Sequence, residues 1–519
     1  MSLPIEDYAL ISDCRTGAMV GRDGSIDWLC FPRYDSASMF GALLGTAEQG
    51  RWLVAPSDGT AVATRSYLDS TFVLATRWVT DTGELEVLDF MPVGDHRSEV
   101  ARRVRCLRGS VEVREELRVR FGYGASMPWM RQLERDGGSD LVAVAGPDAV
   151  VRRGPRLTAR GQLHEATYTL TAGKSVDLTL TWFESHRPAP EPVDVEVALG
   201  ATVEWWRKWA ATCSHEGAYY DEVPADVQIM YGLAGERFLP ERELDSLPGY
   251  QGAAPVRVGN AAFTQFQGDV IGAVMVALSQ AREAGIEEDA FSWPLQQALL
   301  GFVEDHWDAE DQGIWEVRGP KRVFTHSRVM TWAALDRAVR AVREYGLPGP
   351  VHRWEALRDQ VRAEIETRGF DATRNTYVQS YGSTAVDAAL LQLPQVGYCR
   401  ADDPRMLGTV AAIESDLLHD GLLLRYRFGE SEHIDDLPPG EHPFLACSFW
   451  LVEQYARSGR LADARVLMDR LVGLANDVGL LSEEYDLTTN HHAGNTPQAL
   501  SHLALVQAAD WISRADNTP

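Results

Sequence analysis

The sequence predicts a two-domain protein in which an antiparallel β-sandwich precedes an α/α toroid or solenoid of helices. Three observations lead to this prediction: short extended runs separated by turns fill residues 1 to 185, a proline-rich segment follows them, and a helical period governs the remainder. With 519 residues, the chain is also too long for one compact core and suits two domains.

The turns of the first part predict the β-sandwich. Residues 72 to 90 form two extended runs around Asp81-Thr82-Gly83, and residues 167 to 182 form two alternating runs around Ala172-Gly173-Lys174. Both patterns are hairpin signatures, because a turn that contains glycine lets the chain reverse between two strands. One buried sheet face is expected from apolar residues with a period near two, namely Val111, Val113, Leu117, Val119 and Phe121.

A stiff connection is expected after the strands. Residues 187 to 193 read Arg-Pro-Ala-Pro-Glu-Pro-Val, and three alternating prolines exclude both a helix and a central strand. The helix that follows is expected to join the two halves of the chain, and it carries Val203, Trp205, Trp206 and Trp209. We therefore expect a sandwich over 1–186, a linker with its helix over 187–212, and a helical domain over 213–519.

Helical periodicity predicts the second part. Gly346 and Pro348 supply the stop signal of one amphipathic helix, whose apolar face consists of Val329, Leu335, Ala338, Val339 and Val342. About ten helical segments fit between residues 227 and 514 by the same criteria. Antiparallel helices joined by long loops are typical of an α/α toroid or solenoid.

Composition narrows the range of partners. Apolar residues make up 45% and charged residues 24% of the chain, which is the balance of a folded protein. The net charge of −26 repels phosphate backbones and anionic lipid head groups, so nucleic acid and membranes are poor partners, whereas a neutral sugar fits. The chain opens without a basic, apolar leader and contains no uninterrupted apolar stretch of about 18 residues, which predicts a cytoplasmic protein.

Metal and cofactor chemistry finds little support in the sequence. The six cysteines are scattered without paired spacing, which favours free buried thiols over disulfides or a zinc site. Residues 308 to 313 are faintly similar to a calcium loop, but Gly319 stands where the closing glutamate belongs. The adjacent His491 and His492 do not share one face as zinc ligands on a helix do. No P-loop, dinucleotide fingerprint or nucleophile elbow is present, so no cofactor and no metal are expected.

Glu316 is the first candidate for catalysis. It lies in the loop of residues 313 to 319, Gly-Ile-Trp-Glu-Val-Arg-Gly, directly after Trp315. A carboxyl group held against a tryptophan is partly desolvated and can keep a proton near neutrality, as a general acid must. The alternative is that Glu316 only pairs with Arg318 at the edge of the loop.

Glu483 is the second candidate. It lies in residues 480 to 486, Leu-Leu-Ser-Glu-Glu-Tyr-Asp, where three carboxylates in four residues would ordinarily form a solvated helix start. The following residues 494 to 499, Gly-Asn-Thr-Pro-Gln-Ala, read as a helix entrance that would hold the acidic loop in place. Two loops that each carry a carboxyl group, on one helical scaffold, provide the minimum set of groups that glycosidic cleavage requires.

These loops and several other stretches resemble glycoside hydrolase family 15, in its bacterial branch of glucoamylases and trehalases. Residues 7–14 and 21–30 look like the start of the family's β-sandwich, residues 313–319 and 481–486 look like its two catalytic loops, and residues 324–330 and 440–450 are also similar. The resemblance covers nearly the full length. It implies a β-sandwich followed by an (α/α)6 toroid.

The resemblance also implies an activity and a set of site residues. The activity is inverting hydrolysis of an α-glucosidic bond in trehalose or a maltooligosaccharide, with Glu316 as the general acid and Glu483 as the general base. Trp315, Arg318 and His326 are implied as substrate-binding residues. A small carbohydrate is thus the expected partner, and the protein is open to forming a homo-oligomer.

The chain departs from the family's pattern at one place. Similar family members carry several dozen residues with Asn-Trp-Asp-Tyr-Arg and Trp-Leu-Arg-Asp signatures before the segment Gln-Ile-Met-Tyr-Gly-Leu, whereas here Val223 runs straight into Pro224. The missing Arg-Asp pair would grip the outermost glucose, and its segment would supply one helical pair of the toroid. A second hypothesis is therefore a non-catalytic or impaired relative that binds carbohydrate, and a protein-interaction solenoid is disfavoured by the paired glutamate loops.

Overall fold

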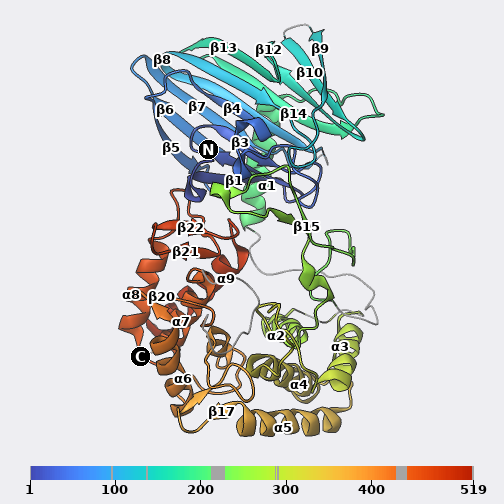
Figure 1. The fold of residues 1–519 in the computed structure, drawn as a ribbon, viewed down its shortest axis with the longest axis vertical. Helices are drawn as coiled ribbons and strands as arrows, with labels where there is room; N and C mark the ends of the chain where they lie inside the picture. Colours follow the sequence, from blue (N-terminus) through green and yellow to red (C-terminus); the bar gives the residue numbers. More distant parts are fainter. Residues whose placement is uncertain are drawn as a thin grey trace.

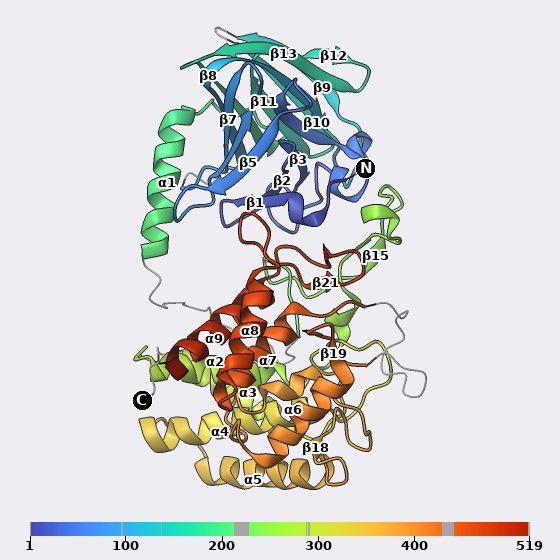
Figure 2. The same ribbon diagram turned by 90° about the vertical axis from the view of Figure 1, so that its left-hand side faces the viewer.

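The computed structural model describes residues 2–94, 97–135, 138–211, 228–286, 288, 291–427 and 441–516. A β domain lies at one end of the long axis and a helical domain at the other (Figure 1). The helix α1 (Val195–Ala211) stands alongside the β domain and points toward the helical domain (Figure 2). The predicted order of strands followed by helices is confirmed.

The β domain consists of two antiparallel layers. One layer has the strand order β1–β2–β3–β4–β8–β13–β12, and the other has the order β5–β6–β7–β8–β14–β11–β10–β9. The strands of the first layer are β1 (Tyr8–Ser12), β2 (Gly17–Gly21), β3 (Ser25–Leu29), β4 (Arg51–Pro56), β8 (Glu99–Arg118), β12 (Thr158–Arg160) and β13 (Leu163–Thr171). The second layer adds β5 (Val62–Tyr67), β6 (Leu74–Val79), β7 (Gly83–Phe90), β9 (Trp129–Arg135), β10 (Gly138–Ala145), β11 (Asp148–Gly154) and β14 (Ser175–Glu184).

The long strand β8 belongs to both layers. Its first half pairs with β7 and β14, and its second half pairs with β4 and β13. Between the two halves Gly109 takes the left-handed region, with φ 70°. The predicted alternation along its second half and just beyond its end is confirmed, because Val111, Val113, Leu117, Val119 and Phe121 are all buried in the core of the β domain.

One predicted hairpin is confirmed and the other is wrong. Strands β6 and β7 pair across Asp81-Thr82-Gly83, as expected. Strands β13 and β14 follow one another across residues 172–174, but each pairs with a different half of β8. The Gly173 amide donates to the Cys106 carbonyl and the Ala172 amide to that of Gly109, both at 2.9 Å. The turn therefore carries the chain from one layer to the other at the bend of β8.

The helical domain contains eight α-helices within the described residues after 228, compared with about ten expected. They are α2 (Val270–Glu283), α3 (Ser292–His306), α4 (Thr325–Tyr345), α5 (Val351–Arg368), α6 (Pro404–Leu417), α7 (Leu445–Arg457), α8 (Leu461–Val472) and α9 (Ala499–Asp516). The predicted helix with the Gly346 stop is α4, and Gly346 closes it in the left-handed conformation at φ 72°. Residues 213 to 226, where a missing helical pair would open the toroid, lie outside the described residues.

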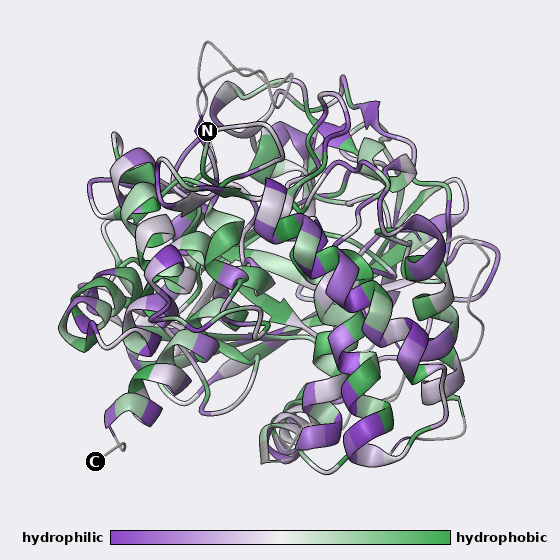
Figure 3. Cartoon of the chain, turned by 90° about the horizontal axis from the view of Figure 1, so that it is seen from below, coloured by the Kyte–Doolittle hydropathy of each residue, from purple (hydrophilic) through white to green (hydrophobic). Residues whose placement is uncertain are grey.

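Burial separates inner helices from outer ones. Most residues of α4 and α7 are buried, whereas α5 and α8 bury only a single stripe. Helix α4 packs on α2 and α5, α7 packs on α8 and α9, and the short 3₁₀ helix η6 (Ala388–Gln392) lies between α4 and α7. Seen from below, these helices alternate between hydrophobic and hydrophilic positions along their length, as amphipathic helices do (Figure 3).

Short two-stranded hairpins connect the helices and shape the loops. They are β15 (Arg242–Glu243) with β16 (Arg257–Val258), β17 (Phe370–Asp371) with β18 (Thr376–Tyr377), β19 (Leu418–His419) with β20 (Leu422–Leu423), and β21 (Glu484–Asp486) with β22 (His491–Ala493). No helix in the described ranges combines the length and apolarity needed to cross a bilayer.

Four of the five cysteines that the structure describes are as predicted, and Cys213 lies outside the described residues. Cys30, Cys106 and Cys447 are free and buried, and Cys399 is free and half-buried. Cys14 is free but exposed, in contrast to the expectation of buried thiols, because it lies in the left-handed turn between β1 and β2.

Candidate active site

Glu316 projects from the loop between α3 and α4. The loop is closed by paired backbone hydrogen bonds between Asp311 and Arg322, at 2.9 and 3.0 Å. Glu316 itself takes the left-handed conformation at φ 55°, which costs a residue with a side chain about 1–3 kcal/mol and is concentrated at functional sites. Its half-buried carboxylate accepts a hydrogen bond from Asn260 Nδ2 at 3.3 Å, and Gln265 Nε2 donates to its carbonyl at 3.3 Å.

The side chain of Trp315 is buried in the core of the helical domain. Only 7% of its surface is exposed, and its Nε1 donates to both carboxylate oxygens of Asp387 at 2.9 Å. Burial raises the pKa of Asp387 to about 6. The indole ring contacts the rings of Phe444 and Trp450, with centroids 5.8 and 6.0 Å away. Trp315 thus fixes the loop to the helical core and leaves Glu316 at its tip.

Glu483 is held by a tight backbone frame. Its carboxylate Oε2 accepts hydrogen bonds from the Asn495 amide at 3.0 Å and from Asn495 Nδ2 at 2.9 Å. Its own amide donates to the Asn495 carbonyl at 2.9 Å, and the Leu445 amide donates to the Glu483 carbonyl at 3.0 Å. Gly494 is required beside it, because φ is 72° and an added Cβ would lie 2.8 Å from Glu483 Oε2. Both donors therefore converge on one oxygen of Glu483.

The two glutamate loops adjoin one aromatic cluster, formed by Trp315, Phe444 and Tyr426 around the guanidinium of Arg425. Phe444 packs on Trp315 and forms a backbone bridge with Glu484, the neighbour of Glu483. The Arg425 guanidinium lies 5.8 Å from the Trp315 ring and 5.9 Å from the Phe444 ring. Packing contacts through Phe444 therefore connect two loops that are far apart in sequence.

Glu484 faces a different environment from Glu483. Burial raises its pKa to about 7, and the nearby carboxylate of Glu441 acts in the same direction. It belongs to β21, which pairs with β22, so the expectation of a solvated helix start at this acidic run is wrong. A strand forms instead, because His492 and its neighbours provide backbone partners for the acidic segment.

The other two predicted site residues differ in exposure. The side chain of Arg318 is 40% exposed and forms an ion pair with Glu241 at 3.0 Å. His326 is 4% exposed in the first turn of α4, and burial lowers its pKa to about 4. His326 therefore lies behind the surface of the loop rather than at it.

Sequence reasoning missed one acidic residue beside Glu316. Asp269 precedes α2 with 6% of its surface exposed, and its Oδ1 is buried without a hydrogen-bond partner among the described residues. Burial raises its pKa to about 7, and the carboxylates of Asp311 and Glu316 add to the effect. In sequence Asp269 reads as an ordinary residue before a helix, so no signal distinguishes it.

The β domain supports the Glu483 loop. Asp477 accepts from the buried Arg65 at 2.7 Å and pairs with Arg22 at 3.2 Å. Asn476 Nδ2 donates to the carbonyls of residues 6 and 8 at 3.3 and 3.0 Å, and Val478 packs against the core of the sandwich. The segment just before Glu483, residues 476–478, is thus inserted into the β domain.

Comparison with known proteins agrees with this architecture. Residues 216–510 match Glycosyl hydrolases family 15, and residues 1–173 match the trehalase-like N-terminal family. A trehalase of Mycolicibacterium smegmatis is 32% identical, with 99% of this chain and 92% of the relative covered. The helical scaffold, the two glutamate loops and these matches define a glycoside hydrolase. The chain belongs to glycosyl hydrolases family 15.

Two further relatives bear on the fold. A trehalase of Thermoplasma volcanium is 27% identical over 98% of this chain and 94% of its own length. A bacterial glucoamylase complexed with acarbose superposes with a TM-score of 0.68 over 99% of this chain and 94% of that chain, at 12% sequence identity. The predicted β-sandwich followed by an (α/α)6-type toroid is confirmed by this likeness.

The trehalase of Mycolicibacterium smegmatis also contains positions that this chain lacks. The alignment of the two chains is 619 positions long, whereas this chain has 519 residues, so at least 100 positions have no counterpart here. These gaps are consistent with the absence of the Trp-Leu-Arg-Asp signature from the sequence.

Proposed function

We propose that this chain is an inverting hydrolase of α-glucosidic bonds, with trehalose as its first substrate class and short maltooligosaccharides as its second. The convergence of the Glu316 and Glu483 loops on one aromatic cluster carries the proposal. The trehalases among its relatives support the order of substrates.

In the proposed mechanism Glu316 is the general acid and Glu483 the general base. Glu316 protonates the leaving glycosidic oxygen while Glu483 draws a proton from a water on the opposite face of the sugar. An inverting pair of carboxyl groups stands about 6.5–9.5 Å apart to admit that water, and the glucose whose anomeric carbon the water attacks is released as the β-anomer. The Asn495 donors support the base role, because they hold one oxygen of Glu483 and leave the other to accept from water.

The substrate contacts belong to the same proposal. Trp315 would form the wall behind the acid, and Arg318 would bond sugar hydroxyls from its half-exposed position. His326 would reach a hydroxyl only after its covering residues move, because it is buried. We also propose the domain limits 1–186, 187–212 and 213–519, a cytoplasmic location, and self-association as a homo-oligomer.

The second candidate is an impaired relative that binds carbohydrate without efficient turnover. At least 100 alignment positions without a counterpart favour it, because the absent segment includes the Arg-Asp pair expected to grip glucose. The two candidate functions require the same fold and differ in the rate at which the chain hydrolyses its substrate.

Glucose release from trehalose, maltose, isomaltose and maltotriose tests the proposal directly. Glu316→Gln and Glu483→Gln should each lower any hydrolysis by about 10²–10⁴-fold, since each removes acid or base assistance. Glu243→Gln, a change at an exposed glutamate on β15, is the matched control. Turnover close to wild type in either active-site variant would show that its role is misassigned. Inversion at one anomeric carbon of trehalose releases one β-glucose and one α-glucose, so α-glucose as the sole first product of trehalose would exclude inversion.

A further inference from the structure

A cavity of about 490 Å³ opens between the two layers of the β domain. Its walls come from both layers: Phe31 and Met39 follow β3, Phe121 follows β8, and Trp182 lies on β14. This volume falls in the range of small-molecule sites. None of the lining residues belongs to the Glu316 or Glu483 loops.

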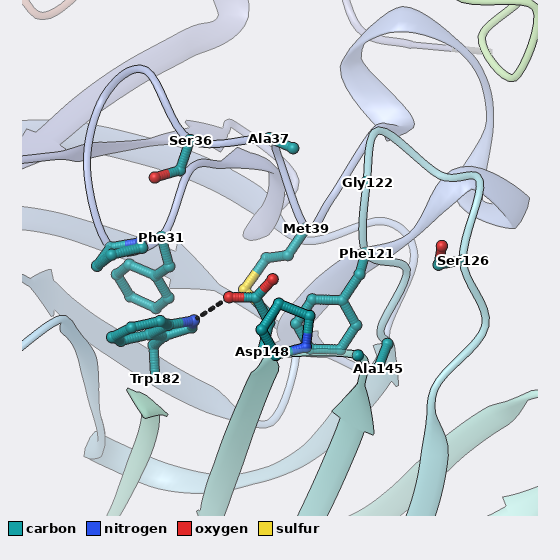
Figure 4. Close-up of a pocket in the computed structure, with 13 residues that line it drawn as sticks. Phe31, Ser36, Ala37, Met39, Phe121, Gly122, Ser126, Ala145, Asp148 and Trp182 are labelled. Atoms are coloured by element: carbon teal, nitrogen blue, oxygen red, sulfur yellow. Dashed lines mark hydrogen bonds between the residues drawn. The ribbon is translucent and has the colours of Figure 1, made fainter. Parts of the chain in front are cut away.

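The floor of the cavity is aromatic and its centre is acidic. Phe31 and Trp182 lie on one side and Phe121 on the other, with the carboxyl group of Asp148 between them (Figure 4). Trp182 Nε1 donates to Asp148 Oδ1 at 3.0 Å, which fixes the carboxylate in the cavity. A carboxylate accepts about four hydrogen bonds, so Asp148 keeps acceptor positions for a ligand. Asp148 is the sole charged residue among those that line the cavity.

The mouth of the cavity adds groups of mixed character. The hydroxyl groups of Ser36 and Ser126 both donate and accept, and Gly122 and Gly146 add no side chains to the cavity wall. A pyranose ring has apolar C–H faces that rest on aromatic rings and hydroxyl groups that donate and accept around its edge. An organic cation would use Asp148 and the rings but not the serines.

We propose that this cavity is a second, non-catalytic carbohydrate site, which holds a neutral mono- or disaccharide against Trp182 with Asp148 accepting from its hydroxyls. The site lies on the sandwich and does not depend on the catalytic roles of the two glutamates. It would let the β domain retain sugar near the helical domain.

Isothermal titration of maltose and trehalose into the full chain tests the site. The chain carries Glu316→Gln and Glu483→Gln, so that no sugar is consumed during the titration. Two binding events are then expected, one at the glutamate site and one at the cavity. Asp148→Ala should weaken only the second, at least about tenfold, because a hydrogen bond to a charged acceptor is lost there. Asp81→Ala, in the exposed turn between β6 and β7, is the matched control and should bind like the parent.

A second variant tests the site without touching a hydrogen bond. Ala37 lines the mouth in an exposed loop, so Ala37→Trp should close the cavity and abolish the binding event that depends on Asp148, while the circular dichroism spectrum stays unchanged. Loss of the same binding event in both variants supports the proposal. Sugar binding that neither variant changes in affinity or stoichiometry lies elsewhere and overturns the proposal, as does the absence of any sugar binding. Choline binding that depends on Asp148 while sugar binding does not would assign the cavity to cations instead.

Discussion

Replacing Asp269 by asparagine should stabilise the protein increasingly as the pH rises. The carboxyl group is buried before α2, one oxygen has no hydrogen-bond partner among the described residues, and the carboxylates of Asp311 and Glu316 are its neighbours. Folding therefore favours the protonated form of Asp269, and asparagine is a neutral group of the same shape. The substitution should therefore recover the free energy of folding that the native protein loses by burying this carboxyl group.

The magnitude follows from the two pKa values. The pKa of Asp269 is 3.8 in the unfolded chain and about 7 in the folded protein. Between these values the folded state binds more protons than the unfolded state, so native stability falls as the pH rises through this window. Relative to a protonated carboxyl group, the loss is about 1 kcal/mol at pH 4.5 and about 4 kcal/mol at pH 8. Asp269→Asn should recover most of each amount.

Urea unfolding followed by tryptophan fluorescence at pH 4.5, 6 and 8 measures this difference. The stability gained by Asp269→Asn should rise by about 3 kcal/mol between pH 4.5 and pH 8. Asp305→Asn, at an exposed position of α3, is the control and should show no such rise. A gain that is equal at all three pH values would refute the reasoning, because it would mean that Asp269 does not titrate in this window.

Three further changes test the frame of the Glu483 loop and the missing segment. Gly494→Ala should destabilise the protein by about 1–3 kcal/mol and reduce turnover, since φ is positive and the new Cβ would meet Glu483 Oε2; a melting temperature and activity like wild type would contradict this. Asp477→Ala should destabilise the protein by about 1–3 kcal/mol, because the buried Arg65 loses its carboxylate partner, and it should lower kcat more than it raises KM. Asp477→Glu should restore part of the rate. An unchanged kcat in Asp477→Ala would show that the contact between Asp477 and Arg65 does not affect catalysis. Insertion of a relative's segment between Val223 and Pro224 should raise glucose release, because each bond from a charged group to the sugar is worth about 1.5–3 kcal/mol; strong trehalose or maltose hydrolysis by the unmodified chain would sink this idea.

Local signals predicted the regular elements well. The turn Asp81-Thr82-Gly83 indicates a hairpin because its two strands are neighbours in space as well as in sequence. The turn at 172–174 has the same local pattern, but its partner is the bend of β8 at Gly109, and a long-range contact of this kind leaves no mark in the turn itself. Helix α4 was predictable because both its periodicity and its Gly346 stop are local.

The candidate site likewise combines residues that the sequence identifies with features that only the folded structure reveals. Glu316 and Glu483 stand in distinctive loops, so the sequence alone identifies them as candidates. Their common setting around Arg425 and Phe444 depends on tertiary packing and could not be foreseen. Asp269 carries no local signature at all, because what makes it unusual is burial beside other carboxylates.

The contacts of residues 476–478 with the β domain constrain the order in which parts of the protein can fold during synthesis. The last strand of the sandwich ends at Glu184, and at about 5–20 residues per second the ribosome needs about 15–60 s more to reach this segment. The sandwich can therefore be folded long before the loop of Glu483 emerges, and it serves as the template on which that loop takes its shape. A nascent chain that stops before residue 476 lacks the contacts of Asn476 and Asp477 with the sandwich, so the proposed general base can be put in place only after the sandwich has formed.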